Sequence, residues 1–193
     1  MTILGDAAAT PFDIMVAMNQ VYLFAKRLWN SSKKVIGIGG DHALTWCLLR
    51  AARDFNNGEP VALVHLDSHL DTGDEYHGNK LSHGTALRRA MEDGCVDVEK
   101  STHIGIHGSM ASDDLMKEDE EKGWLTITLE DFVEKGPAAV AEIVKERIGT
   151  APTIISFDVD VLEPGECPGI GFPEPGIKTS FQFFFFKTNF KVE

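Results

Sequence analysis

The stretch that decides the fold is Val61-Ala62-Leu63-Val64-His65-Leu66-Asp67-Ser68-His69-Leu70-Asp71. Its first half is an apolar run of the kind that forms a buried strand, which we expect over residues 61–66. Side chains two positions apart on a strand point to the same face. If the extended geometry persists, Asp67, His69 and Asp71 therefore converge at the end of this strand. Charged groups in such a place are costly unless they are paired, hydrogen-bonded or bound to a metal.

Two further stretches repeat this pattern of an apolar run followed by charged residues. The run 153–157 precedes Asp158-Val159-Asp160, and the run 35–38 precedes Gly39-Gly40-Asp41-His42. One Asp-x-Asp alone is commonly a turn or a helix cap, and one histidine such as His42 is commonly a capping or core residue. Three such clusters, each at a predicted strand end, favour metal binding. Carboxylates and imidazoles without a thiolate suit Mn(II), and also Mg(II) or Zn(II), and these clusters offer enough ligands for two ions.

The remaining pattern along the chain predicts an alternation of strands and helices. We expect helices over 12–30, 43–55, 83–93, 112–122 and 130–148, and strands over 35–38, 61–66, 102–107, 124–129 and 153–159. The polar, glycine-containing segment 72–82 is typical of a loop. Such an alternation predicts an α/β layer architecture with a parallel sheet. Ligands of these sheets bind beyond the carboxyl ends of the strands, where all three charged clusters lie.

Composition limits the classes of function. The 193 residues suffice for one domain with a full core, and the net charge of -12 argues against nucleic-acid binding. The same charge is compatible with a cationic substrate, or with nothing more than solubility. Three scattered cysteines indicate reduced thiols and an intracellular, cytoplasmic setting. No apolar run approaches the roughly 20 residues of a membrane span, and no signal-peptide pattern opens the chain.

The charged clusters together resemble the metal motifs of a known family. Gly39–His42, Asp67–Asp71 and Ser156–Asp160 are similar to the three metal motifs of the ureohydrolases, which include arginase and agmatinase. The stretch Ser82–Ala90 looks more like agmatinase. The resemblance covers roughly residues 5 to 176. It implies a three-layer α/β/α arginase-like fold with a mainly parallel sheet, incomplete in this chain, so that 1–176 form a partial ureohydrolase domain. The phenylalanine-rich tail 177–193 lies outside the resemblance and is either an edge strand or a non-native tail.

The resemblance also implies a binuclear site for two Mn(II) ions. The family's ligands of one ion are matched by His42, Asp67, Asp71 and Asp158. Those of the other ion are matched by Asp67, His69, Asp158 and Asp160. Asp67 and Asp158 would then bridge the two ions, and Asp71 would orient the attacking hydroxide. His83 matches the proton-shuttling histidine of the family, or is simply an N-terminal helix residue. Glu174 matches the carboxylate that holds the guanidinium, or is simply a loop charge.

The reaction implied by the resemblance is hydrolysis of a guanidino group by a metal-bridging hydroxide. Agmatine, which would give putrescine and urea, is the first expectation. The alternatives are guanidinobutyrate, arginine or formiminoglutamate as substrate, or a catalytically inactive truncated fragment. We therefore expect a small cationic guanidino substrate and, in an intact fold, a homo-oligomer, with neither nucleic acid nor a membrane as partner.

Overall fold

The computed structural model describes residues 4–31, 34–110, 112 and 114–176. The chain divides into two compact units, which are described separately. The first comprises Met1–Val61 and Asp71–Val96, and the second comprises Ala62–Leu70 and Asp97–Glu193. The expected phenylalanine-rich tail 177–193 lies outside the described residues.

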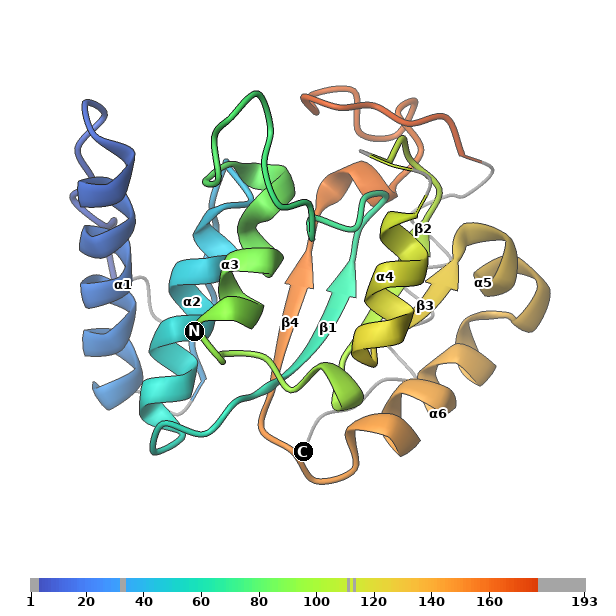
Figure 1. The fold of residues 1–193 in the computed structure, drawn as a ribbon, viewed down its shortest axis with the longest axis horizontal. Helices are drawn as coiled ribbons and strands as arrows, with labels where there is room; N and C mark the ends of the chain where they lie inside the picture. The colour runs from blue at the N-terminus through green and yellow to red at the C-terminus, as the bar shows by residue number, and fades with distance from the viewer. Residues whose placement is uncertain (1–3, 32–33, 111, 113, 177–193) are drawn as a thin grey trace. The chain divides into compact units, whose positions relative to one another are not determined.

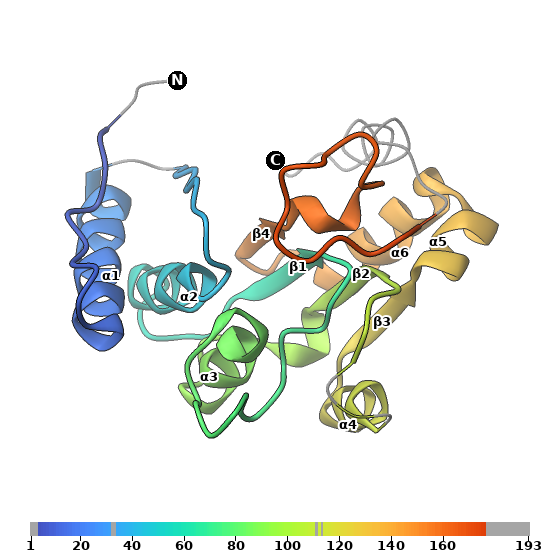
Figure 2. The same cartoon turned by 90° about the horizontal axis from the view of Figure 1, so that it is seen from above.

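The second unit is built on a parallel sheet, as the sequence predicts. Its strands are β1 Ala62–Leu66, β2 Thr102–Ile106, β3 Leu125–Thr128 and β4 Thr153–Phe157. They lie in the order β3-β2-β1-β4, and every described pairing is parallel (Figures 1 and 2). All residues of β1 and β2 are buried, whereas β4 is partly exposed. The two central strands therefore form the interior of this unit, as is usual for parallel strands.

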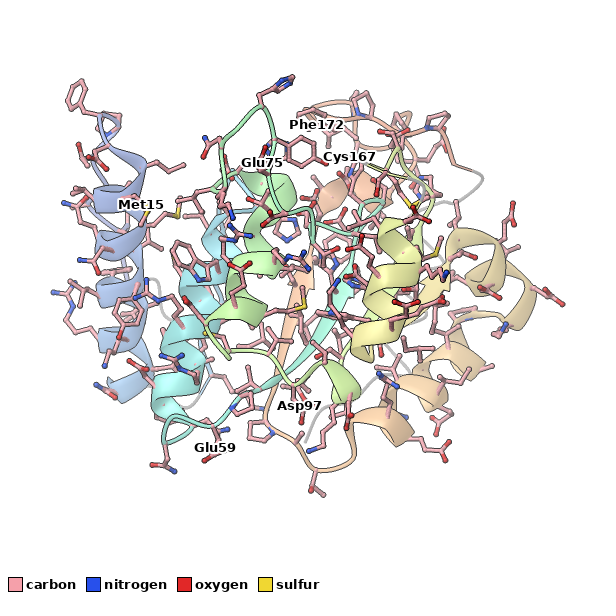
Figure 3. All side chains as sticks on the ribbon, viewed as in Figure 1. Met15, Glu59, Glu75, Asp97, Cys167 and Phe172 are labelled. Atoms are coloured by element: carbon pink, nitrogen blue, oxygen red, sulfur yellow. The ribbon has the colours of Figure 1, made fainter. Side chains whose placement is uncertain are left out.

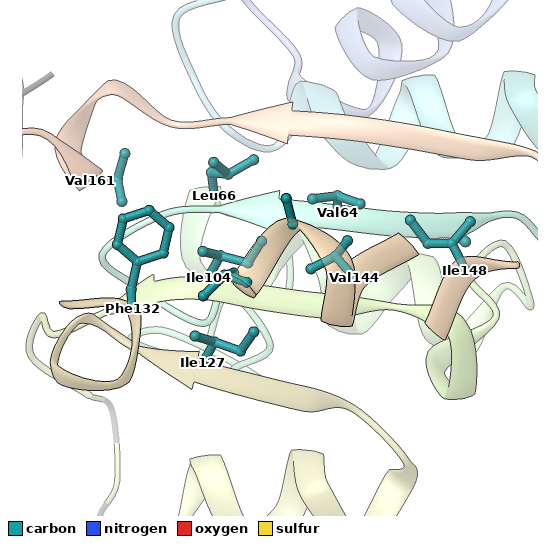
Figure 4. Close-up of a cluster of buried hydrophobic side chains, with 11 residues drawn as sticks. Val64, Leu66, Ile104, Ile127, Phe132, Val144, Ile148 and Val161 are labelled. Carbon is teal, nitrogen blue, oxygen red and sulfur yellow. The ribbon is translucent and has the colours of Figure 1, made fainter. Parts of the chain in front are cut away.

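Helices α5 Leu129–Lys135 and α6 Pro137–Ile148 cover the two central strands (Figure 4). Phe132 of α5 and Val144 of α6 pack into one buried cluster with Val64, Leu66 and Ile104. Helix α4 Leu115–Lys122 contributes to a smaller cluster, in which Leu115 packs with Leu70 of the segment after β1 and with Ile106, the last residue of β2. Burial of these side chains is the main favourable contribution to folding of the unit.

The sequence predicts one helix over 130–148, and this prediction is wrong. The chain forms two helices because Gly136 has a φ of 77°, which ends α5. Pro137 then occupies the first turn of α6, where its missing N–H costs no hydrogen bond. The start of α5 is capped by Thr128, whose Oγ1 accepts the N–H of Asp131 at 3.1 Å.

The first unit is helical. Helix α1 Ile14–Ser31 packs on α2 Leu44–Phe55, and α3 Ala86–Glu92 packs on α2 after the short helix η1 His83–Thr85 (Figure 2). Met15 projects from α1 and is exposed (Figure 3). None of the helices that the structure describes is both long and apolar enough to cross a membrane.

The strand expected over 35–38 is not formed, so that prediction is wrong. These residues have no regular secondary structure, and Ile36 and Ile38 are 75% and 96% exposed. An apolar run becomes a strand only when a neighbouring strand satisfies its backbone N–H and C=O groups. Within the described part of the chain, no strand pairs with this run.

Candidate metal centre

The backbone leaves the extended conformation directly after β1. The N–H of His69 donates to Asp67 Oδ1 at 2.6 Å, which closes a turn of the type that aspartate favours. Asp71 has a positive φ of 55°. The alternation expected to carry Asp67, His69 and Asp71 to one face therefore does not persist, and a turn, not a strand, positions Asp67 and His69.

The segment after β4 also turns. Asp158 caps the short helix η3 Val159–Val161, because its Oδ1 accepts the N–H of Asp160 at 3.0 Å. Asp158 and Asp160 are thus positioned by a helical turn and not by the expected strand alternation. The N–H of Ser68 donates to Asp160 Oδ1 at 3.1 Å. This hydrogen bond joins the segments that follow β1 and β4, two adjacent strands of the sheet.

Asp67, His69 and Asp160 form a compact group, which we call the Asp67 cluster. One ligand atom from each residue can be chosen so that all lie within 4.8 Å of one another. His69 Nδ1 lies 2.9 Å from Asp160 Oδ2 and 3.5 Å from Asp67 Oδ1. Asp67 and Asp160 are buried, with 1% and 6% exposed. Asp158 lies beside the cluster in the chain but is not one of its members.

The electrostatics of the Asp67 cluster favour a cation. Hydrogen bonds to Asp160 and then to Asp67 raise the pKa of His69 from 6.5 to about 11. The two carboxylates therefore hold a proton on the imidazole as their counter-charge. A divalent ion would replace this proton, because imidazole must be neutral to act as a ligand. Oxygen and nitrogen donors without sulfur fit Mn(II), Mg(II) or Zn(II).

Glu174 lies at the edge of the Asp67 cluster. Its Oε1 accepts hydrogen bonds from the N–H and the hydroxyl of Ser109, each at 3.0 Å, and lies 3.4 Å from His69 Nε2. The N–H of Ser109 is the largest cause that lowers the pKa of Glu174, so the carboxylate is ionised at neutral pH. No pattern in the sequence indicated Ser109, because its role depends on a contact 65 positions away.

A glycine and an aromatic ring shape the surroundings of His69. A Cβ atom on Gly108 would lie 2.8 Å from His69 Nε2 and 3.0 Å from Glu174 Cγ. Any other residue at this position would push the two side chains away. The ring of Phe172, labelled in Figure 3, is nearly perpendicular to the ring of His69, with the centroids 6.4 Å apart and the planes at 84°.

The first unit contains the other three candidate residues. His42 Nδ1 lies 2.9 Å from Asp71 Oδ2, and both side chains are nearly buried. His83 is the first residue of η1, and its ring stacks on Tyr76 with a centroid distance of 6.4 Å. Gly84 allows this contact, because a Cβ there would lie 2.6 Å from the ring of Tyr76.

The chain is therefore an α/β protein whose parallel sheet carries an acidic, histidine-containing candidate metal cluster beyond the carboxyl ends of two adjacent strands. Among α/β proteins, the chain belongs to the arginase family, whose model matches residues 1–185.

Several relatives support this assignment. The chain is 39% identical to a guanidinopropionase of Pseudomonas aeruginosa, over 93% of this chain and 56% of that protein. It is 35% identical to an agmatinase of Chromobacterium violaceum, over 82% of this chain and 46% of that protein. The solved proclavaminate amidino hydrolase of Streptomyces clavuligerus matches with a TM-score of 0.88 and 33% identity, over 94% of this chain and 60% of that one. The chain spans about half the length of these curated relatives.

Proposed function

We propose that this protein hydrolyses a guanidino group with the help of two Mn(II) ions. The observation that carries the proposal is the Asp67 cluster, in which one ligand atom from each of the three residues can be chosen so that all lie within 4.8 Å of one another. The family and the names of the relatives support the chemistry. The resemblance of the motifs adds Asp158, His42 and Asp71 to the proposed ligands, so the second ion rests on the sequence.

The residues around the cluster suit this reaction. Glu174 is ionised and uses Oε1 for Ser109, which leaves Oε2 for the N–H groups of a planar guanidinium. His83 is the proposed proton carrier for the leaving amine, because it matches the proton-shuttling histidine of the family and histidine is the side chain that most often acts as a general acid or base. When bound, a pair of divalent cations activates water for attack on an electron-poor carbon.

Agmatine is the first candidate substrate, with putrescine and urea as products. The stretch Ser82–Ala90 and the acidic loop 72–82 favour it, because a cationic tail suits an acidic border. Within this loop, however, Asp74 is paired with Arg89 at 2.7 Å and lies 3.6 Å from Lys80. These pairs neutralise part of the acidity of the loop.

A guanidino acid is the second candidate substrate. The 39% identity to a guanidinopropionase favours it, as does the partial neutralisation of Asp74. The two candidates differ in the charge of the tail and share the guanidino group.

A panel of substrates tests the proposal. Purified protein loaded with Mn(II) would be assayed for urea release from agmatine, 3-guanidinopropionate, 4-guanidinobutyrate and arginine. We expect release from one of the first two compounds, and its loss in Asp67→Ala. Glu142→Gln, which changes an exposed carboxylate of α6, serves as the control that keeps activity. A folded, Mn(II)-loaded protein that releases no urea from any of the compounds would refute the proposal.

A further inference from the structure

Glu174 is held by one residue of the loop that follows β2. The N–H and the hydroxyl of Ser109 both donate to Glu174 Oε1, each at 3.0 Å. His69 Nε2 lies 3.4 Å from the same oxygen. Within the described part of the chain, no hydrogen bond reaches Glu174 Oε2. Two donors from one residue restrict the rotation of the carboxylate more than a single donor would.

The loop that carries Ser109 is itself tied to the Asp67 cluster. The N–H groups of His107 and Gly108 donate to the carbonyl oxygen of Ser68, at 3.1 and 2.8 Å. In the chain, Ser68 lies between two members of the cluster. Backbone hydrogen bonds therefore set the position of Ser109 relative to the cluster, and they do not depend on the rotamer of any side chain.

A close approach of two loops makes the contact possible. Ser109 and Glu174 are 65 positions apart in the chain. Gly108 allows the approach, because a Cβ atom there would lie 3.0 Å from Glu174 Cγ. A glutamate side chain is long and flexible, and it loses conformational entropy when a ligand orders it. A carboxylate that is already ordered loses less, so the ligand binds more tightly.

We propose that Ser109 is the positioning residue of the substrate-binding carboxylate: its N–H and hydroxyl hold Glu174 Oε1, so that Oε2 is ordered for the guanidinium group before the substrate binds. This inference rests on the proposed function, in which Glu174 holds the guanidinium. Ser109 then acts on the group that all candidate substrates share, and not on the tail by which they differ. Its loss should change KM for agmatine and for a guanidino acid by the same factor.

Substitutions of Ser109 separate positioning from folding. Ser109→Ala removes the hydroxyl and keeps the N–H, whereas Ser109→Thr keeps both donors. We expect Ser109→Ala to raise KM about 3-fold to 10-fold for each substrate that the wild type hydrolyses, because one hydrogen bond to the carboxylate is lost. The value of kcat should change less than about 2-fold, since the lost interaction serves binding. Ser109→Thr should regain most of the loss.

Two controls accompany these kinetics. Mn(II) affinity by titration calorimetry and thermal unfolding of Ser109→Ala should match the wild type, because Ser109 is exposed and is not a proposed ligand. Thr150→Ala removes an exposed hydroxyl from the turn before β4 and should keep the wild-type KM. An unchanged KM in Ser109→Ala would overturn the inference, as would a change that depends on the tail or that follows the loss of stability. An equal loss in Ser109→Thr would overturn it too.

The contact can also be measured without substrate or metal. Hydrogen exchange of the Ser109 amide should be at least about 10-fold faster in Glu174→Ala than in the wild type, because Glu174 accepts the N–H of this exposed residue. Equal rates would overturn the inference even if the wild type hydrolyses its substrate. A wild type that releases no urea would overturn the proposed function, and with it the role of Ser109. Urea release by the wild type with an unchanged KM in Ser109→Ala would overturn the inference alone.

Discussion

Strands β1 and β4 are adjacent and parallel, and both are rich in apolar residues, yet their side chains have different surroundings. Leu66 of β1 is the register partner of Phe157 of β4, and Val64 is the partner of Ile155. Leu66 and Val64 are 3% and 0% exposed, whereas Phe157 and Ile155 are 47% and 50% exposed. The comparison teaches that an apolar run predicts a strand, but its place in the sheet decides how much that strand contributes to stability.

The carboxyl ends of the same two strands are alike. Each strand is followed by a tight turn that an aspartate closes with its own side chain. Asp67 and Asp160 are both buried within the same cluster. The two strands therefore differ in how their side chains are packed, whereas the turns that follow them both supply residues to the Asp67 cluster.

Truncation of β1 is expected to have the largest effect on stability. Leu66→Ala would remove a fully packed side chain from the cluster under α5 and α6 and lower the free energy of unfolding by about 2–5 kcal/mol. Urea unfolding of the metal-free protein measures this change. If Leu66→Ala lowers the free energy of unfolding no more than Ile155→Ala does, the central strand β1 does not contribute more to stability than the edge strand β4.

The proton that the Asp67 cluster holds on His69 predicts that metal binding depends on pH. A metal must displace the proton of His69, whose pKa is raised to about 11, so affinity for Mn(II) should rise by up to about tenfold per pH unit between roughly pH 7 and 9. Titrations at several pH values measure this slope, and His69→Asn should reduce it. An unchanged slope in the variant would show that another group releases the proton.

The same proton links pH to stability of the metal-free protein. Because the pKa of His69 is raised on folding, its contribution is fully present below the unfolded-state value of 6.5 and is lost as the pH rises through about 11. Urea unfolding at increasing pH should therefore show falling stability in the wild type, with a smaller decline in His69→Asn.

Substitution of Thr128, the residue that caps α5, tests how much the position of this helix over the central strands contributes to stability. Thr128→Ala removes the acceptor for the N–H of Asp131 and should lower the free energy of unfolding by about 1 kcal/mol, because α5 carries Phe132 into the core. Thr128→Ser keeps the hydroxyl and is the matched control. If both variants lose the same amount, the methyl group of Thr128, and not the cap, is responsible.

The smallest effect is expected on the edge strand. Ile155→Thr replaces a half-exposed side chain with another β-branched residue and should change the free energy of unfolding by less than about 0.5 kcal/mol. It should also reduce self-association in light scattering, because exposed apolar side chains on an edge strand favour aggregation. A loss comparable to that of Leu66→Ala would mean that Ile155 is buried in solution.

Much of the fold was predictable from the sequence, and the exceptions have physical causes. Periodicity and composition indicated β1, β2, β3, β4 and helices α1 to α4 close to their observed positions. The helix break at Gly136-Pro137 was missed although both residues disfavour a continuous helix. The run 35–38 was wrongly expected to be a strand, because strand formation depends on a partner that the run itself does not specify.

The candidate site was also predictable only in part from the sequence. The sequence by itself determined the α/β class and the kinds of ligand, because apolar runs and charged residues are local properties of the chain. Tertiary structure decided that turns, and not strand alternation, bring Asp67, His69 and Asp160 together, and that Ser109 holds Glu174. It also placed His65 beside His103, since the register between two strands depends on packing across the sheet. Contacts between residues distant in the chain are set by the burial of a whole sheet, which no short motif encodes.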